Sequence, residues 1–162
     1  MKTRTITQLT MLLAMSILIN ILEPAYFISG IPGVKFGVAN SIGLIALYIF
    51  GQKEMWNINL LRVILASILR GIIFGIGFWM SLAGMILSTL FTTIAYKLNK
   101  FTPVGISIGS AYFHTIGQII ALIFLTKNIM MIYWLPIPLF VSIVAGYLTG
   151  FISNIVIKRF NK

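Results

Sequence analysis

Apolar residues dominate this chain in six long stretches, which short polar segments separate. The stretches cover roughly residues 6–22, 36–51, 56–75, 79–96, 105–125 and 133–157. A membrane-spanning helix needs about 20 mostly apolar residues, so the chain length allows about six with short loops. The pattern therefore predicts an all-α, integral membrane bundle of six transmembrane helices, built as a single domain over residues 1–162.

The composition agrees with a location in the bilayer. Of the 162 residues, 59% are hydrophobic and 9% are charged, whereas soluble domains are about 45–50% apolar and about 25% charged. In water, such a chain would expose large apolar patches. Six helices with short loops also leave no room for a separate soluble domain.

The first stretch resembles a secretory signal peptide, because Met1-Lys2-Thr3-Arg4 precedes its apolar residues. Signal peptides end in a small-residue, A-x-A-like cleavage site. This stretch ends instead in Leu22-Glu23-Pro24. We therefore expect it to be retained as the first helix.

Lysine and arginine residues predict the orientation, because the cytoplasmic loops of membrane proteins carry an excess of them. With the N-terminus in the cytoplasm, only Lys35 and Lys127 fall outside. The residues that fall inside are Lys2, Arg4, Lys53, Lys97, Lys100, Lys158, Arg159 and Lys162. This bias predicts an even number of spans with both termini in the cytoplasm. It also explains the net charge of +10 without nucleic acid as a partner.

The residue inventory excludes several kinds of chemistry. The chain has no cysteine, no aspartate, one histidine and two acidic residues, Glu23 and Glu54. Disulfides, thiolate nucleophiles, cysteine-bound metals and histidine-rich metal clusters are therefore excluded. No G-x-x-x-x-G-K-[ST] motif is present, so ATP is not bound in a P-loop. We accordingly expect no catalytic residue, no metal and no cofactor.

Two arginines lie within the third stretch, where a charge at mid-helix costs about 2.5–3.5 kcal/mol. Arg62 and Arg70 are eight residues apart, which separates them by about 80° around a helix and about 12 Å along it. Both can therefore face the interior at different depths. For Arg62 the alternative is snorkelling to cytoplasmic head groups. For Arg70 we favour a functional role over snorkelling outwards.

Polar groups also line one face of the fifth stretch, because Ser110, His114 and Gln118 recur at intervals of four residues. Each needs a hydrogen-bond partner inside a bilayer. Partners from neighbouring helices would make His114 an ordinary packing residue. A bound ligand would make this face part of a site, and the sequence leaves both alternatives open.

Further polar residues gather near the outer ends of the first two stretches. They are Asn20, Glu23, Lys35 and Asn40. Glu23 either pairs with Arg70 or Lys35 or contacts a ligand. The segment 23–35 contains Pro and Gly at turn positions, and we expect it to fold over the outer mouth as a lid.

Together these residues predict a site for a small anionic ligand with an aromatic or isoprenoid body, which enters from outside. Positive charge exceeds negative charge in the outer half of the bundle. Lys35 and Arg70 would neutralise the acidic group of the ligand. Asn40, His114 and Gln118 would fix its orientation by hydrogen bonding.

Small residues recur at the spacing of helix contacts, where they let backbones approach closely in lipid. They form the pairs Gly71–Gly75, Gly105–Gly109 and Gly146–Gly150 and the stripe Gly84, Ser88 and Thr92. We interpret these residues mainly as packing positions.

The strongest family signal is the segment Ile31-Pro32-Gly33-Val34-Lys35-Phe36-Gly37-Val38-Ala39-Asn40. Further blocks follow it in order, namely Leu60-Leu61-Arg62-Val63, Ser81-Leu82-Ala83-Gly84, Pro103-Val104-Gly105-Ile106-Ser107 and His114-Thr115-Ile116-Gly117-Gln118. The blocks span nearly the whole chain. They resemble the bacterial membrane family labelled Gx transporter, or heptaprenyl diphosphate synthase component I.

The first label implies similarity to the S components of energy-coupling factor (ECF) transporters. These are six-helix bundles of the bacterial plasma membrane that capture vitamins or their precursors outside the cell. They work with a membrane T component and cytoplasmic ATPase subunits. The first helix of an S component commonly meets the T component through an A-x-x-x-A arrangement, which Thr10 and Ala14 match only in part. This label implies an importer subunit, for which our leading hypothesis expects a quinone-precursor-like ligand.

The second label implies a role in prenyl diphosphate synthesis. Chain-elongating prenyl synthases resemble one another in aspartate-rich motifs that hold magnesium against diphosphate, and this chain has no aspartate. Our leading hypothesis is the S-component-like subunit, which is not an enzyme. The alternative is a non-catalytic membrane accessory subunit of isoprenoid or quinone biosynthesis, and a carrier that works alone is a third hypothesis.

Overall fold

The computed structural model describes residues 3–23 and 37–160. This part of the chain folds into six α-helices and one short 3-10 helix, without strands. The elements are α1 (Thr3–Leu22), α2 (Val38–Phe50), α3 (Gln52–Leu69), α4 (Ile76–Lys97), α5 (Pro103–Thr126), η1 (Ile129–Trp134) and α6 (Pro136–Phe160). The all-α prediction is confirmed, and each apolar stretch contains one helix. Lys35 and residues 24–35 of the expected lid lie outside the described residues.

The end of the third helix differs most from the sequence prediction. The apolar pattern predicts a helix over 56–75, whereas α3 ends at Leu69. The backbone is left-handed at Gly71 (φ 67°) and again at Phe74 (φ 62°), and a left-handed glycine commonly ends a helix. The expected packing role of the Gly71–Gly75 pair is therefore wrong, because both glycines lie in the connection between α3 and α4.

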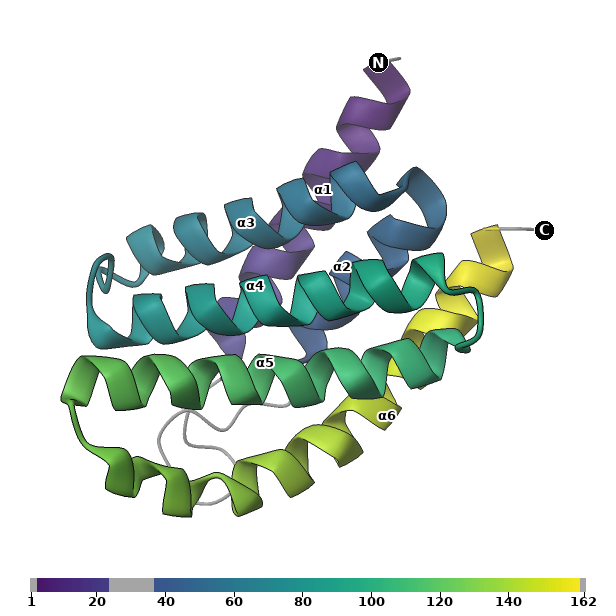
Figure 1. Ribbon diagram of the computed structural model, residues 1–162. Helices are drawn as coiled ribbons and strands as arrows, with labels where there is room; N and C mark the ends of the chain where they lie inside the picture. Colours follow the sequence, from purple (N-terminus) through teal and green to yellow (C-terminus); the bar gives the residue numbers. More distant parts are fainter. Residues whose placement is uncertain (1–2, 24–36, 161–162) are drawn as a thin grey trace.

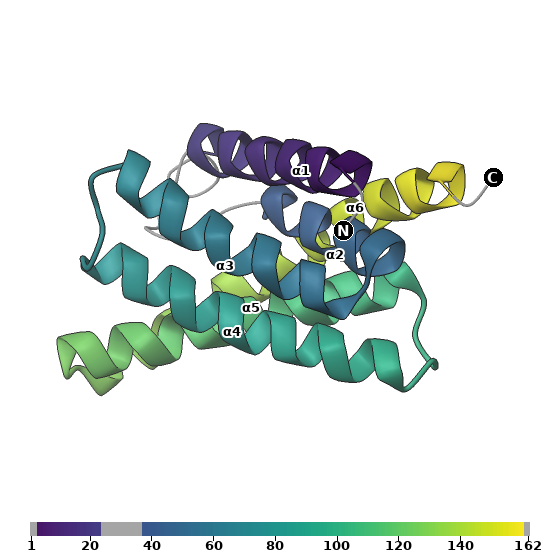
Figure 2. The same ribbon diagram turned by 90° about the horizontal axis from the view of Figure 1, so that it is seen from above.

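Helices that follow one another in the chain mostly pack together in the bundle (Figure 1). α4 packs along α5, and α5 packs along α6. α1 contacts α2 and α3, and α2 also contacts α6. Figure 2 shows α1 on the opposite side of the bundle from α4. α2 thus lies inside the bundle, in agreement with its continuous run of buried residues.

Glycines allow α4, α5 and α6 to approach one another closely. A Cβ atom at Gly117 of α5 would lie 2.7 Å from a backbone carbonyl oxygen of α4. A Cβ atom at Gly84 of α4 would lie 2.8 Å from a carbonyl oxygen of α5, and Cβ atoms at Gly146 and Gly150 of α6 would lie 2.8 Å from atoms of α5. Side-chain bulk at these positions would separate the backbones. The predicted packing role of the Gly146–Gly150 pair and of Gly84 is confirmed.

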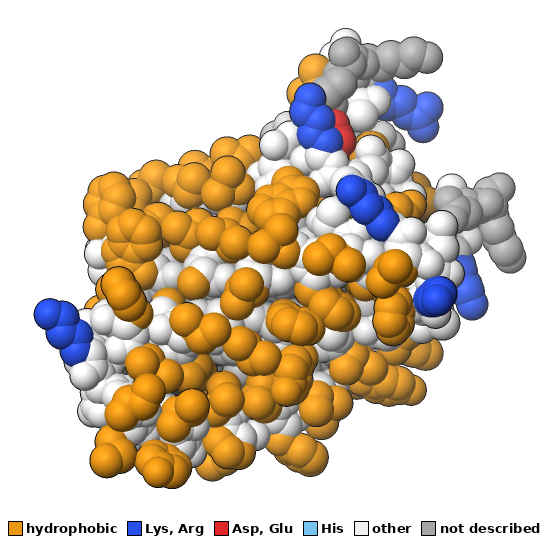
Figure 3. Space-filling view, viewed as in Figure 1, with side chains coloured by type: hydrophobic (Ala, Val, Ile, Leu, Met, Phe, Trp, Pro, Cys, Tyr) orange, Lys and Arg blue, Asp and Glu red, His pale blue; other side chains and the backbone are white. Residues whose placement is uncertain are grey.

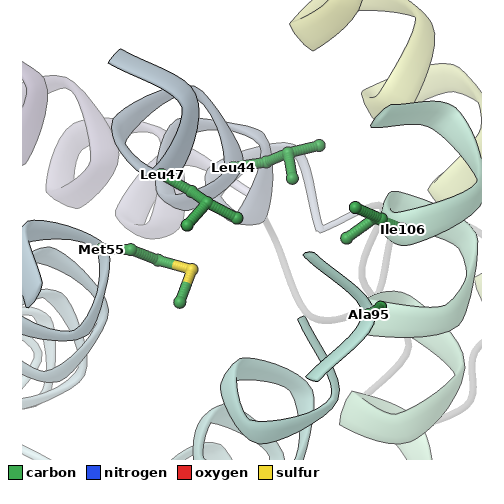
Figure 4. Close-up of a cluster of buried hydrophobic side chains, with 5 residues drawn as sticks. All are labelled: Leu44, Leu47, Met55, Ala95 and Ile106. Atoms are coloured by element: carbon green, nitrogen blue, oxygen red, sulfur yellow. The ribbon is translucent and has the colours of Figure 1, made fainter. Parts of the chain in front are cut away.

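A cluster of buried apolar side chains joins α2, α3, α4 and α5 (Figure 4). Its members come from the C-terminal parts of α2 and α4 and the N-terminal parts of α3 and α5. They are Leu44, Leu47, Met55, Ala95 and Ile106. Tyr48 and Tyr96 pack against the cluster, edge to face, with ring centroids 5.2 Å apart.

Four helices, α1, α4, α5 and α6, are long and apolar enough to cross a membrane. α2 is apolar but has 13 residues. A helix of that length reaches about 20 Å, whereas the hydrocarbon core of a bilayer is about 30 Å thick. α3 is more polar, because it contains Glu54 in its first turn and Arg62 in its interior. A multi-pass membrane protein is supported, and the count of six spans stays a prediction.

The face of the bundle shown in Figure 3 is largely apolar, and the Lys and Arg side chains visible on it lie towards its ends. Phe124 is 83% exposed and Phe74 is 71% exposed, as suits side chains that face lipid. The α2–α3 and α4–α5 connections lie at the same end as both termini, and the α3–α4 connection lies at the other end (Figure 1). Lysines at the first end include Lys53 and Lys97, and Lys127 follows α5 at the other end.

Gly117→Ala tests the close contact between α4 and α5, with Gly105→Ala as a matched control in the same helix. A Cβ atom would meet a backbone oxygen at 2.7 Å at position 117, but nothing nearer than 3.5 Å at position 105. Overpacking costs about 1–3 kcal/mol, whereas alanine otherwise favours a helix over glycine. We expect Gly117→Ala to lower the thermal midpoint in detergent and Gly105→Ala to maintain or raise it. Equal midpoints would contradict the contact.

The orientation can be measured with single cysteines, because the chain has none. Lys127 and Lys100 are both exposed and lie at opposite ends of the bundle. We expect Lys127→Cys to react with a membrane-impermeant maleimide on intact cells. Lys100→Cys should react only after the membrane is opened, since positively charged loops stay in the cytoplasm. The reverse pattern, or equal labelling of both variants, would overturn the predicted orientation.

Candidate functional site

Side chains from all six helices line one cavity inside the bundle. The cavity has a volume of about 70 Å³, and a water molecule requires about 10–15 Å³ of such space. It therefore has room for several water molecules. Its lining consists of Asn20, Glu23, Gly37, Ala39, Asn40, Arg62, Val63, Ser81, Ala111, His114, Thr115, Gln118, Pro138, Ser142 and Ala145. These residues are mostly polar or small, so the cavity is suited to a polar ligand.

Arg62 of α3 is the buried cation of this cavity. Its side chain is 2% exposed, and its Nη2 donates a hydrogen bond to Oδ1 of Asn40 at 2.8 Å. Its Nε and Nη1 are buried without a hydrogen-bond partner among the described residues. The snorkelling alternative is therefore wrong, because the guanidinium group lies inside the bundle rather than at its surface.

Glu23, directly after α1, brings a carboxylate to the same cavity. Its Oε1 accepts a hydrogen bond from the backbone N–H of Val38 at 2.7 Å, in the first turn of α2. A carboxylate is stabilised at a helix N-terminus, where backbone N–H groups lack helical partners. Glu23 also interacts electrostatically with Arg62 and Arg70. One acidic group thus serves one helix terminus and two guanidinium groups.

Arg70 does not line the cavity. It follows α3 as its C-terminal cap residue, and its Nη2 donates to the backbone carbonyl oxygen of Asn20 in α1. This contact joins the ends of α1 and α3. The structure therefore places Arg62, rather than Arg70, among the residues that a ligand in the cavity would meet.

Three of the predicted binding residues meet at the cavity. Asn40 of α2 and His114 and Gln118 of α5 all line it. Lys35 lies outside the described residues, and Arg70 lies outside the lining. The binding role of all five residues stays a prediction.

A smaller cavity of about 20 Å³ adjoins the first one and shares Asn40 with it. Ser110 lines the smaller cavity. Asn59 does so too, and its Nδ2 donates to Oγ1 of Thr89 at 3.0 Å. The predicted polar face of α5 is therefore divided, because Ser110 faces a different cavity from the other two polar residues of that face.

Sequence reasoning missed the hydroxyl-bearing residues of the lining, namely Ser81, Thr115 and Ser142. Thr115 donates to the carbonyl oxygen of Ala111 at 3.2 Å, and Ser142 donates to that of Leu139 at 2.8 Å. Serine and threonine commonly bond to the backbone of their own helix in this way. Such residues are therefore common throughout apolar helices, and their pattern gives no signal that separates a cavity lining from ordinary packing.

Two other expectations concern metals and partner docking. Among residues 3–23 and 37–160, no group of three or more His, Cys, Asp or Glu side chains is placed to hold a metal ion. Thr10 and Ala14 are exposed on α1. A partner can reach both residues, and their docking role stays a prediction.

The helices and the cavity define a helical membrane protein with a polar, arginine-lined interior. The chain belongs to the heptaprenyl diphosphate synthase component I family, whose sequence model matches residues 12–156. The match includes residues from every described helix, and it confirms the family resemblance. No curated protein and no solved structure matches the chain.

Glu23→Ala tests the structural role of the Glu23 carboxylate. The matched control is Glu54→Ala, which removes the other acidic residue of the sequence. A hydrogen bond to a charged group contributes about 1.5–3 kcal/mol. Glu54 in the first turn of α3 contributes about 0.3–1 kcal/mol through the helix dipole. We expect Glu23→Ala to lower the free energy of unfolding in a detergent titration clearly more than Glu54→Ala. Equal losses would show that Glu23 is not a structural link.

Proposed function

We propose that the chain is a membrane-embedded, non-catalytic component that works with a separate catalytic subunit in polyprenyl diphosphate synthesis. The family match over residues 12–156 carries this proposal. The residue inventory supports the non-catalytic part, because the chain has no aspartate and two glutamates. Magnesium is held by oxygen ligands, chiefly carboxylates, in sites that bind phosphates. The catalytic site would therefore lie in the partner.

The basic end of the bundle is the surface that we propose for this partner. It includes Lys53, Lys97, Lys100, Lys158 and Arg159. A soluble subunit with an acidic face would bind there through charge attraction, which steers association. The apolar exterior would hold the complex in the bacterial plasma membrane, where long prenyl chains also partition.

A second function has one specific observation in its favour, which is the polar cavity inside the bundle. In this proposal the chain is an S-component-like subunit of an ECF-type importer. It would bind a small anionic precursor with an aromatic or isoprenoid part. A membrane T component would contact α1 near Thr10 and Ala14, which are exposed, and cytoplasmic ATPase subunits would drive transport.

The partner decides between these functions. We expect affinity purification from native membranes in mild detergent, followed by native mass spectrometry, to recover a prenyl synthase subunit with the chain. Recovery of a membrane protein with two ATPase subunits would overturn the accessory role and support the importer. Recovery of the chain alone would contradict both functions, and uptake by the chain alone in liposomes would then identify a carrier.

A charge-reduced variant locates the partner surface. Exposed ion pairs contribute up to about 1 kcal/mol each, so a Lys97→Gln, Lys100→Gln double variant should recover several-fold less synthase subunit than the wild type. Lys127→Gln at the other end of the bundle is the control and should recover the wild-type amount. Equal recovery by both variants would exclude the basic end as the docking surface.

A further inference from the structure

Two guanidinium groups, that of Arg62 at the wall of the cavity and that of Arg70 outside it, share one carboxylate. Arg62 is buried at its wall, and the whole sequence has two acidic residues, Glu23 and Glu54. Glu54 lies eight residues before Arg62 on α3, about 12 Å away along the helix. Glu23 lines the cavity but interacts with Arg70 as well as Arg62. One carboxylate therefore serves two guanidinium groups.

Arg62 also has hydrogen-bond donors without acceptors. A guanidinium group carries five N–H donors, and Nη2 donates to Asn40. Nε and Nη1 are buried and have no partner within the described part of the chain. Water in the cavity can accept from these groups, but a neutral molecule does not balance a buried charge. An anion with several acceptor oxygens both accepts these hydrogen bonds and balances the charge.

The size of the cavity restricts the ligand. Its volume of about 70 Å³ holds several water molecules, whereas sites that enclose whole drug-sized ligands are about 300–1,000 Å³. A carboxylate or phosphate group fits this space, and a complete prenyl chain does not. Gln118 and Ser81 line the same cavity and carry N–H and O–H groups that can donate to such a group.

We propose that the cavity is a binding site for an oxyanion head group, either a carboxylate or a phosphate, which Arg62 holds through Nε and Nη1. Gln118 and Ser81 complete the site with neutral donors, and the apolar part of the ligand lies outside the cavity. Arginine suits this role because its planar fork matches carboxylate and phosphate oxygens. The site depends on this chain alone. Its test can therefore fail or succeed independently of the partner in the proposed function.

The test is calorimetric titration of the purified full-length chain in maltoside micelles, which contain no phosphate or carboxylate. The probes are acetate, inorganic phosphate and inorganic diphosphate. We expect saturable binding of at least one probe, and at least about tenfold weaker binding by Arg62→Gln, since a charge-assisted contact is removed. Arg4→Gln removes the same charge from the exposed first turn of α1. This control should bind within about twofold of the wild type.

A second variant gives an effect of the opposite sign. Glu23→Gln keeps an oxygen that can accept from the Val38 N–H but removes the negative charge that competes with the ligand for Arg62. We expect Glu23→Gln to bind the anion several-fold more tightly than the wild type. This variant tests the site even if Arg62→Gln fails to fold. A merely structural role of Glu23 does not predict tighter binding.

Three results would overturn the proposal: no saturable binding of any probe, equal binding by Arg62→Gln and Arg4→Gln, or weaker binding by Glu23→Gln. The same titration in nanodiscs that contain phosphatidic acid separates two sources of the oxyanion. Probe binding that persists in these nanodiscs identifies a free oxyanion as the ligand. Binding that is lost there identifies a lipid head group as the occupant, and both results support the site.

Discussion

The burial of Arg62 inside a membrane bundle is the constraint on which the rest of the site depends. Taking a charge out of water costs several kcal/mol, so its neighbours must offset that cost. Asn40 accepts one of its hydrogen bonds, and Glu23 supplies negative charge. These partners come from the start of α2 and the end of α1. The guanidinium group therefore links the N-terminal helices to α3, and its position determines where the polar cavity lies.

The two halves of the bundle are held together by different interactions. In α4, α5 and α6, glycines such as Gly117 and Gly146 bring backbones into direct contact, which is how helices associate where lipid provides no hydrophobic driving force. α1 and α3 are joined instead by the bond from Arg70 to the carbonyl oxygen of Asn20 and by apolar side chains of α1 that pack against a cluster containing Ile58. Both halves line the cavity. The glycine-packed half provides a closely packed wall, and the other half provides the charged groups of Arg62 and Glu23.

The hydrophobic pattern predicts one helix for each apolar stretch, because a lipid-facing helix must be apolar over most of its length. It does not predict the end of α3, since Ile72, Ile73 and Phe74 continue the apolar run through the connection. Spacing also fixes the angle between Arg62 and Arg70 without showing which of them faces the neighbouring helices. That depends on packing with α1 and α2, which a single helix pattern does not contain. The same tertiary packing brings Asn40 of α2 to the cavity that His114 and Gln118 of α5 also line.

Buried Arg62 indicates which chemical group the two proposed functions would have in common. Carboxylates hold magnesium in sites that bind phosphates, whereas an arginine binds an oxyanion without a metal. This chain has Arg62 at the wall of its cavity, and an arginine there suits the anionic group that we propose as the ligand. In the proposed synthase complex that group would belong to a prenyl substrate or product. In the proposed importer it would belong to a precursor. The two functions therefore share one binding chemistry and differ in the partner that acts on the bound molecule.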